Sequence, residues 1–308
     1  MNANLKSIIL MIIAMGCLTL TDMLIKIASQ TLPIGQVMIF YGVGALVVFW
    51  GLLSIKSESI RLTPLTNTAV IWRNVGDLIS VNSMFLALVF VPLSTIGAVI
   101  QAVPLLVTAA AALFLGEKVG IRRLFAIFTG FVGTLLIIQP GAAGFDITVT
   151  LVIFAAVGMA LRDIATKLVR ENFSTLLLSF YSCFLFIFSG IILLIIDGNP
   201  AIPAMDNVII LTAMIFAGCL GFFLMTEAVR LGDMSVVIPF RYTRLLFSIV
   251  AGVLILGEQV NAIMLIGSAL TIFSGLPKAP LKIFLKTSNG DAPNRIIIKE
   301  DNKNANIT

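Results

Sequence analysis

The segment LGEKVGIRRLFAIFTGFVGTLLI at 115–137 has a second, diverged copy, LGEQVNAIMLIGSALTIFSG, at 256–275. The Leu-Gly-Glu triplets that open the two copies are 141 residues apart. The same offset joins three further pairs of residues: Asp22 with Asp163, Lys26 with Lys167, and Ser94 with Ser235. A constant offset through several landmarks indicates an internal repeat. The chain is therefore predicted to contain two copies of one structural unit.

The composition of the chain places both copies in a membrane. Hydrophobic residues make up 59% of the sequence and charged residues 11%, and the mean hydropathy is +1.10. Ten apolar stretches are long enough to cross a hydrocarbon core of roughly 30 Å as helices. They lie near 5–25, 34–55, 69–90, 94–115, 122–138, 148–168, 174–196, 207–229, 235–256 and 260–276. The predicted fold class is an all-α integral membrane protein with ten transmembrane helices.

The repeat divides these ten spans into two sets of five, over residues 1–140 and 141–277. Because five is an odd number, the second set must enter the membrane from the opposite side, so the two five-helix repeats are inverted. Inverted repeats are typical of secondary transporters, in which the substrate site lies between the halves near the membrane midplane. Residues 278–308 are polar and are predicted to form a disordered cytoplasmic tail.

Basic residues are distributed unevenly about the predicted spans. Lysine and arginine number 20 against 15 acidic residues, which gives a net charge of +5. With the N-terminus in the cytoplasm, fifteen basic residues fall in cytoplasmic loops, span ends or the tail, and only Lys26 falls on the other side. This asymmetry predicts a multi-pass protein of the bacterial inner membrane with both termini cytoplasmic, and it explains the basic excess without a nucleic-acid partner. The first stretch is predicted to be a retained span, since the repeat requires it.

Several kinds of chemistry are missing from the sequence. There is no histidine, and Cys17, Cys183 and Cys219 lie singly within spans. Histidine-based catalysis and metal ligation are therefore excluded, and we expect neither a metal nor a cofactor nor an enzymatic activity. A non-transporting membrane scaffold, an intramembrane enzyme and a channel remain the alternatives to a transporter.

The repeated segment at 115–137 resembles the end of a drug/metabolite transporter repeat of the EamA type. That pattern is an apolar helix, a Gly-Glu pair, a short polar turn and a final helix punctuated by glycine. The matching residues are Gly116, Glu117, Gly130 and Gly133 in the first copy and Gly257, Glu258 and Gly267 in the second. The resemblance covers about residues 5–277 and implies a ten-helix carrier that moves small metabolites through a central cavity. We interpret the Gly-Glu pair as structural, with the glycine allowing a tight turn and the carboxylate meeting nearby basic groups.

The stretch PFRYTRLLF at 239–247 is similar to a subgroup of this family that includes riboflavin importers and S-adenosylmethionine carriers. The similarity makes riboflavin and S-adenosylmethionine candidate substrates. Export of amino acids or of other small metabolites or drugs is the alternative. The expected partners are a small-molecule substrate and the lipid bilayer, with the chain acting as a monomer or homodimer.

Arg241 and Arg244 lie inside this apolar stretch, where a charge is costly and indicates function. Three residues apart, they share a helix face and could bind an anionic or carbonyl-bearing part of a substrate. Arg244 is predicted near the midplane, whereas Arg241 could instead reach the interface by snorkelling. Tyr242 and its repeat mate Gln101 are further candidates for the substrate site.

The third span is unusually polar and adds Asn74 and Asp77 to the candidate substrate-binding residues. Asp77 could pair with Arg73 four residues earlier, with Arg244, or with substrate. Pro104 is the better candidate for a hinge, because the backbone carbonyl that it leaves unpaired needs a cavity or a neighbour, whereas Pro239 lies in the first turns of its span, where proline is often simply tolerated. The candidate gating or coupling residues are Asp22, Lys26, Asp163, Lys167, Arg73 and Pro104.

Overall fold

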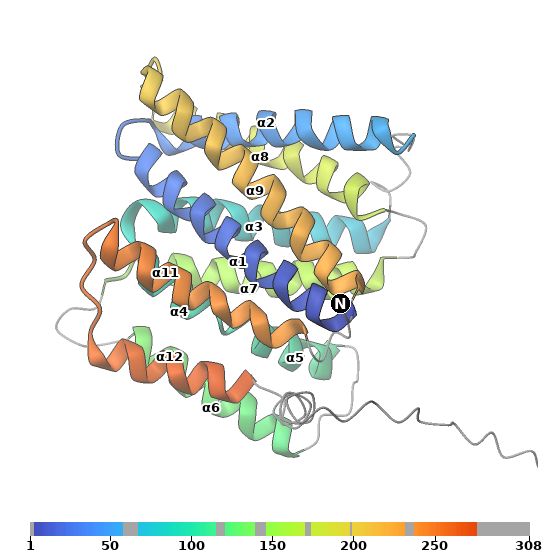
Figure 1. Ribbon diagram of the computed structural model, residues 1–308, viewed down its shortest axis with the longest axis vertical. Helices are drawn as coiled ribbons and strands as arrows, with labels where there is room; N and C mark the ends of the chain where they lie inside the picture. The colour runs from blue at the N-terminus through green and yellow to red at the C-terminus, as the bar shows by residue number, and fades with distance from the viewer. Residues whose placement is uncertain are drawn as a thin grey trace, which may run out of the picture. The chain divides into compact units, whose positions relative to one another are not determined.

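The computed structural model describes residues 3–57, 67–114, 121–138, 146–169, 174–197, 199–231 and 237–275. Within these ranges the regular structure is helical throughout (Figure 1). The first repeat contributes α1 (Ala3–Ala28), α2 (Ile34–Ile55), α3 (Thr68–Phe90), α4 (Leu93–Ile100), α5 (Val103–Phe114) and α6 (Ile121–Ile138). The second contributes α7 (Val149–Leu168), α8 (Thr175–Asp197), α9 (Met205–Leu231), the 3₁₀ helix η2 (Ile238–Tyr242), α11 (Thr243–Leu254) and α12 (Ala262–Gly275).

These helices correspond to the ten predicted spans, with α4 and α5 together forming the fourth and η2 and α11 the ninth. Five helices of the described part are long and apolar enough to cross a membrane unaided: Asn4–Ala28, Ile34–Ile55, Val149–Thr166, Leu176–Ile196 and Met205–Met225. Among the others, α3 carries buried charges, and the fourth and ninth spans are each divided into two short helices. The predicted all-α membrane fold is confirmed.

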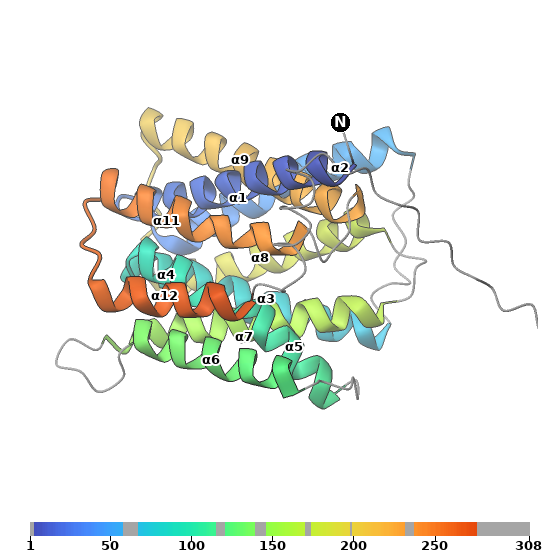
Figure 2. The same ribbon diagram turned by 60° about the horizontal axis from the view of Figure 1, so that its bottom comes forward.

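Helices of the two repeats pack against each other in a symmetric pattern. In both views α1 lies along α9, and the corresponding helices of the other repeat, α7 and α3, lie along each other (Figures 1 and 2). Three further pairs join equivalent helices: α2 with α8, α6 with α12, and α4 with α11. Exchanging the repeats leaves this set of pairs unchanged, as expected for two inverted copies. The two halves are therefore interlocked.

Glycine brings α3 and α7 unusually close. A Cβ atom on Gly158 of α7 would lie 2.6 Å from the backbone nitrogen of Ser80 on α3. A Cβ atom on Gly76 of α3 would lie 2.6 Å from the backbone nitrogen of Arg162 on α7. Both positions therefore exclude every larger residue without a shift of backbone, and the approach sets Arg162 next to the polar face of α3.

Replacing Gly158 with alanine is expected to lower the free energy of unfolding by about 1–3 kcal/mol, because the added methyl group forces α3 and α7 apart. The matched control is Gly51→Ala in α2, where an added Cβ atom meets nothing within 4 Å. That change is expected to be neutral or slightly stabilising, since alanine is the better helix former. Thermal unfolding of the two purified variants measures the difference. Equal melting temperatures would contradict the close packing of α3 on α7.

Spans four and nine are each interrupted at the same point of the repeat. The first part of span four ends at Gln101 and Ala102, and the corresponding residues Tyr242 and Thr243 join η2 to α11. In span four the break follows from Pro104, which lacks an amide hydrogen and lies in the first turn of α5. Pro104 thus lies beside the interruption, and its role as a hinge stays a prediction. Pro239 lies in the first turn of η2, and the break in span nine comes three residues later.

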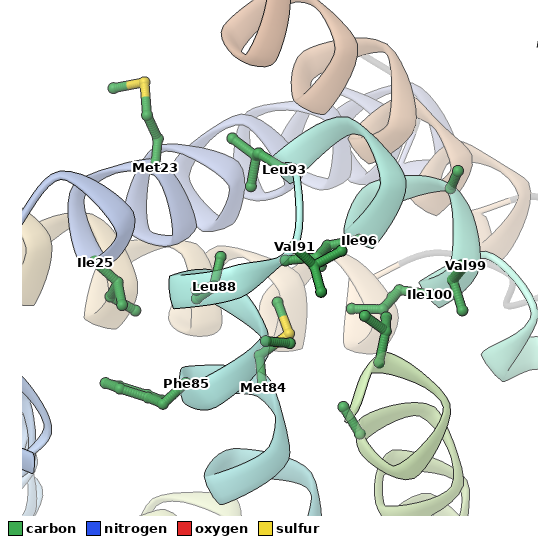
Figure 3. Close-up of a cluster of buried hydrophobic side chains, with 14 of the residues drawn as sticks. Met23, Ile25, Met84, Phe85, Leu88, Val91, Leu93, Ile96, Val99 and Ile100 are labelled. Atoms are coloured by element: carbon green, nitrogen blue, oxygen red, sulfur yellow. The ribbon is translucent and has the colours of Figure 1, made fainter. Parts of the chain in front are cut away.

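A cluster of buried apolar side chains lies where α1, α3 and α4 meet, beside the turn at Val91 and Pro92 (Figure 3). We call this end of the bundle the α3–α4 end. The labelled members of the cluster are Met23, Ile25, Met84, Phe85, Leu88, Val91, Leu93, Ile96, Val99 and Ile100. They belong to a larger core that also includes Leu245 and Ala251 of α11. Apolar packing thus joins α1, α3, α4 and α11 at this end.

Candidate functional site

Asp77 is the centre of a buried polar group that joins α3, α7 and α8. Its carboxylate pairs with Arg73, Nη1 to Oδ2 at 3.2 Å, and with Arg162, Nη1 to Oδ1 at 3.7 Å. Ser182 of α8 donates a hydrogen bond to Asp77 Oδ2 at 2.7 Å. Arg162 in turn pairs with its neighbour Asp163 at 2.9 Å. The structure thus shows the pairing of Asp77 with Arg73 and not the one with Arg244.

Arg73 has further partners that hold its guanidinium in place. Nη1 donates to Ser182 Oγ at 2.9 Å, to the Leu178 carbonyl oxygen at 3.3 Å and to Asn74 Oδ1 at 3.3 Å. Asn74, a candidate substrate residue in the sequence, therefore lies beside Arg73. Arg73, Asp77 and Ser182 thus link α3 to α8, and Arg162 adds α7. The predicted roles of Asn74 and Asp77 in substrate binding and of Arg73 in gating stay predictions.

Arg244 of α11 pairs with Asp22 of α1, Nη2 to Oδ2 at 2.6 Å. Both side chains are largely buried, with 16% and 11% of their surfaces exposed. The sequence singled out each residue separately but did not predict their contact, which spans 222 positions of the chain. A buried pair of this kind is stable only while both members are present, since a single charge left behind is strongly destabilising.

Arg241 has a different environment. It is half-buried, and its Nη2 contacts the Met225 sulfur at 3.8 Å. It forms no ion pair with any carboxylate of the described residues. Asp163 and Arg162 of α7 lie within electrostatic range of its guanidinium. Among the described residues, Arg241 therefore has no carboxylate bound to it.

Gln101 and Tyr242 lie at the two helix breaks and have unsatisfied polar groups. Both side chains are buried, 4% and 5% exposed. Within the described part of the chain, neither Gln101 Nε2 nor the Tyr242 hydroxyl has a hydrogen-bond partner. Buried polar groups are rarely left unpaired, because each costs on the order of 1–3 kcal/mol. The two repeat mates thus provide polar atoms available to a bound molecule.

Lys26 and Glu258 hold the turn between α3 and α4 from two sides. Lys26 Nζ donates to the carbonyl oxygens of Leu88 at 3.0 Å and Val91 at 2.7 Å, at the end of α3. Glu258 accepts hydrogen bonds from the backbone nitrogens of Leu93 at 2.5 Å and Ser94 at 2.9 Å, at the start of α4. A cation at a helix C-terminus and an anion at an N-terminus both match the helix dipole. The turn is therefore fixed by side chains of α1 and of the α11–α12 connection.

The two residues of the second Gly-Glu pair act as the sequence predicted only in part. Gly257 has a φ of +68°, which confirms a tight turn that favours glycine. The Glu258 carboxylate lies within electrostatic range of Lys26, a basic group as expected. Its hydrogen bonds, however, go to the backbone of α4 and to Ser94 Oγ at 2.7 Å. No sequence signal pointed to this cap, because its partners lie 164 and 165 residues away.

Replacing Glu258 with glutamine is expected to lower the free energy of unfolding by about 1–2 kcal/mol, because it removes a charge from the N-terminus of α4. The Ser94→Ala variant removes a single hydrogen bond at the same place and is expected to cost about 1 kcal/mol or less. Melting temperatures of both purified variants test this order. A larger loss for Ser94→Ala would show that the charge of Glu258 is not the main contributor.

Some candidate positions fall outside the described residues. The side chain of Lys167 is one of them, and the others are Glu117 of the first Gly-Glu pair and Ser235, the repeat mate of Ser94. In the part of the chain that is described, no group of three acidic or cysteine side chains is arranged to hold a metal ion.

Comparison with known proteins identifies relatives of the chain. The sequence profile of the EamA-like transporter family matches residues 5–139 and again residues 146–276. The S-adenosylmethionine uptake transporter of Rickettsia conorii is 26% identical over 68% of this chain and 68% of its own length. The riboflavin transporter of Vibrio cholerae is 28% identical over 58% of this chain and 59% of its own length.

Two further matches extend over most of the chain. The pseudopaline exporter CntI of Pseudomonas aeruginosa is 23% identical over 87% of this chain and 94% of its own length. A solved crystal structure superposes with a TM-score of 0.60 over 92% of this chain and 98% of that one, at 17% identity. At this identity the likeness to the solved structure shows the fold alone.

Proposed function

The chain belongs to the EamA-like transporter family, and from this premise we propose that it carries a small organic metabolite across the bacterial inner membrane by alternating access. The observation that carries this proposal is the group of charged side chains between the two repeats. Arg241 and Arg244 flank the break in span nine. Arg244 pairs with Asp22 of α1, and Asp163 of α7 lies within electrostatic range of Arg241. Charges at such positions mark substrate or ion pathways in membrane proteins.

The two spans that are broken supply the geometry that a transport site needs. Broken helices near the midplane expose backbone and polar side chains to a central site, and inverted repeats let that site open to either side. Gln101 and Tyr242 occupy equivalent breaks, and α4 and α11 pack along each other. These features support a substrate site between the repeats, lined by Arg241, Tyr242 and Gln101.

The α3–α4 end is the closed end in this conformation. A Cβ atom on Gly97 of α4 would collide with the side chain of Ser248 on α11, and the core described above continues across both helices. Toward the other end, α5 packs mainly on α7 and α6, whereas η2 packs on α1 and α11. With the N-terminus in the cytoplasm, the closed end faces outward. We therefore assign Lys26 to an outer gate and the Asp22–Arg244 pair to gating or coupling.

S-adenosylmethionine and riboflavin are the candidate substrates. Relatives named for the uptake of the first and the transport of the second support them. The exporter match extends over more of the chain, which favours export of a small metabolite as the second candidate. In either case the chain is expected to act as a monomer or homodimer without an enzymatic step.

Counterflow in proteoliposomes tests the proposal. Vesicles that contain the purified protein and are preloaded with unlabelled S-adenosylmethionine, riboflavin or an amino-acid mixture should take up the matching labelled compound, with saturable kinetics and a transient overshoot. A channel gives flux without an overshoot, and a scaffold or an intramembrane enzyme gives no flux. The absence of counterflow with all three preloads would reject transport of these classes.

A further inference from the structure

The ionic groups between the repeats leave one positive charge without a bound partner. Four arginines within the spans have described side chains, Arg73, Arg162, Arg241 and Arg244, and the aspartates facing them are Asp22, Asp77 and Asp163. Arg244 pairs with Asp22. Arg73 pairs with Asp77, and Arg162 pairs with both Asp77 and Asp163. Glu227 of α9 is half-buried and pairs with none of the four arginines. The excess cation in this group is therefore Arg241.

The unsatisfied polar atoms of Gln101 and Tyr242, at the two helix breaks, are hydrogen-bond donors. Gln101 Nε2 carries two N–H groups, and the Tyr242 hydroxyl carries one O–H group. The charge of Arg241 acts on the Tyr242 hydroxyl, so the two groups lie within electrostatic range of each other. Gln101 occupies the matching break in α4, the helix that packs against α11. A half-buried cation accompanied by unpaired donors is suited to an anion, because charge-assisted hydrogen bonds are the strongest that such groups form.

We infer that Arg241, together with Tyr242 and Gln101, binds a single anionic group of the transported molecule, a carboxylate or a phosphate. The inference rests on the proposed transport function and narrows its substrate class. The planar guanidinium of arginine matches either group through two parallel hydrogen bonds. Binding one anion balances the three aspartates against the four arginines.

The inference separates the candidate substrates by their chemistry. S-adenosylmethionine carries one carboxylate, whereas riboflavin carries neither a carboxylate nor a phosphate. An anion-binding Arg241 therefore favours an amino-acid-like molecule, or a phosphorylated one, over riboflavin itself. The head group of an anionic lipid has the same chemistry as a free phosphate, so the experiment must distinguish these two sources.

The test measures binding of matched probes to the protein in nanodiscs of phosphatidylcholine, by isothermal titration calorimetry. One pair is S-adenosylmethionine and its decarboxylated form, which lacks only the carboxylate. The other is flavin mononucleotide and riboflavin, which lacks the phosphate. In one of the pairs, the member that carries the anionic group is expected to bind at least about tenfold more tightly than the member that lacks it. Arg241→Gln should abolish that preference, whereas Arg241→Lys should retain part of it. A repeat in nanodiscs that contain phosphatidylglycerol shows whether anionic lipid competes.

Tyr242→Phe separates a binding role from a structural one. Because the hydroxyl has no partner among the described residues, its removal should leave the melting temperature of the unliganded protein unchanged or higher. The same variant should weaken binding of the anionic probe by about three- to tenfold. Lys6→Ala, which removes an exposed charge in α1, is the control and should alter neither quantity.

The outcomes are decisive for the inference and for the transport function separately. The anion site is overturned if, in both pairs, the probe that lacks the carboxylate or phosphate binds as tightly as the probe that carries it, or more tightly. A preference that persists in Arg241→Gln, or binding that is lost when phosphatidylglycerol is present, also overturns it. Counterflow of riboflavin without an anionic preference would reject the anion site and leave transport standing. Anion-selective binding without counterflow would reject transport and leave the anion site standing.

Discussion

Replacing Asp77 with asparagine is expected to lower the free energy of unfolding by about 3–5 kcal/mol, the cost of leaving a buried ion pair without one member. The change removes the carboxylate that Arg73 and Arg162 share and that Ser182 donates to. Asp163 alone then faces two guanidinium groups. Thermal unfolding of the purified protein in detergent, with wild type and variant side by side, measures the loss.

Asp206→Asn is the matched control for this experiment. Asp206 is exposed in the first turn of α9, so its replacement should cost less than about 1 kcal/mol. The double variant Asp77→Asn with Arg73→Gln removes one charge of each sign and should recover part of the lost stability. A melting temperature for Asp77→Asn equal to that of wild type would mean that water reaches and solvates the two arginines.

Replacing Arg244 with alanine is expected to reduce the initial rate of uptake into proteoliposomes at least tenfold, because truncating one partner of a buried charge pair typically costs about 2–5 kcal/mol. Asp22 would remain on α1 without its partner, between helices that pack directly on each other. Rates are compared at equal amounts of reconstituted protein, with the substrate that gives counterflow in the wild type.

The double variant Asp22→Asn with Arg244→Gln distinguishes a transport role from a purely structural one. It keeps a neutral hydrogen-bonding pair in place, so it should fold, yet it should still fail to transport. Lys6→Ala, in which an exposed basic residue is lost, should transport at the wild-type rate. Normal uptake by Arg244→Ala, with normal folding, would remove this residue from the transport machinery.

Local patterns in the sequence predicted most of the fold. Hydropathy located all ten spans, and the offset of 141 residues identified the repeat, because both signals are written along the chain. The pairing of Arg73 with Asp77 was one of three alternatives for Asp77, suggested by their spacing of one helical turn. Pro104 indicated the break in span four through its missing amide hydrogen, whereas nothing comparable marks Tyr242 in span nine.

Contacts between segments that lie far apart in the chain could not be predicted from the sequence. Asp22 and Arg244 are 222 residues apart, and the sequence contained nothing to choose between Asp22, Asp77 and substrate as the partner of Arg244. The same holds for Glu258 at the start of α4. The sequence shows that an arginine within a span needs a partner, but the packing of the helices determines which residue that is. Among the described residues, no carboxylate is bound to Arg241.

The interlocked pairing of the helices bears on how the protein is made. The main packing partners of α1, α2, α3 and α6 all belong to the second repeat, so they do not exist while the first half leaves the ribosome. Each early helix must then reside in the lipid without its final neighbour. For α3 this would expose charge to hydrocarbon, but Arg73 and Asp77 lie on the same helix and neutralise each other until α7 arrives with Arg162. The i, i+4 pair would thus lower the cost of placing α3 in the lipid before α7 is inserted.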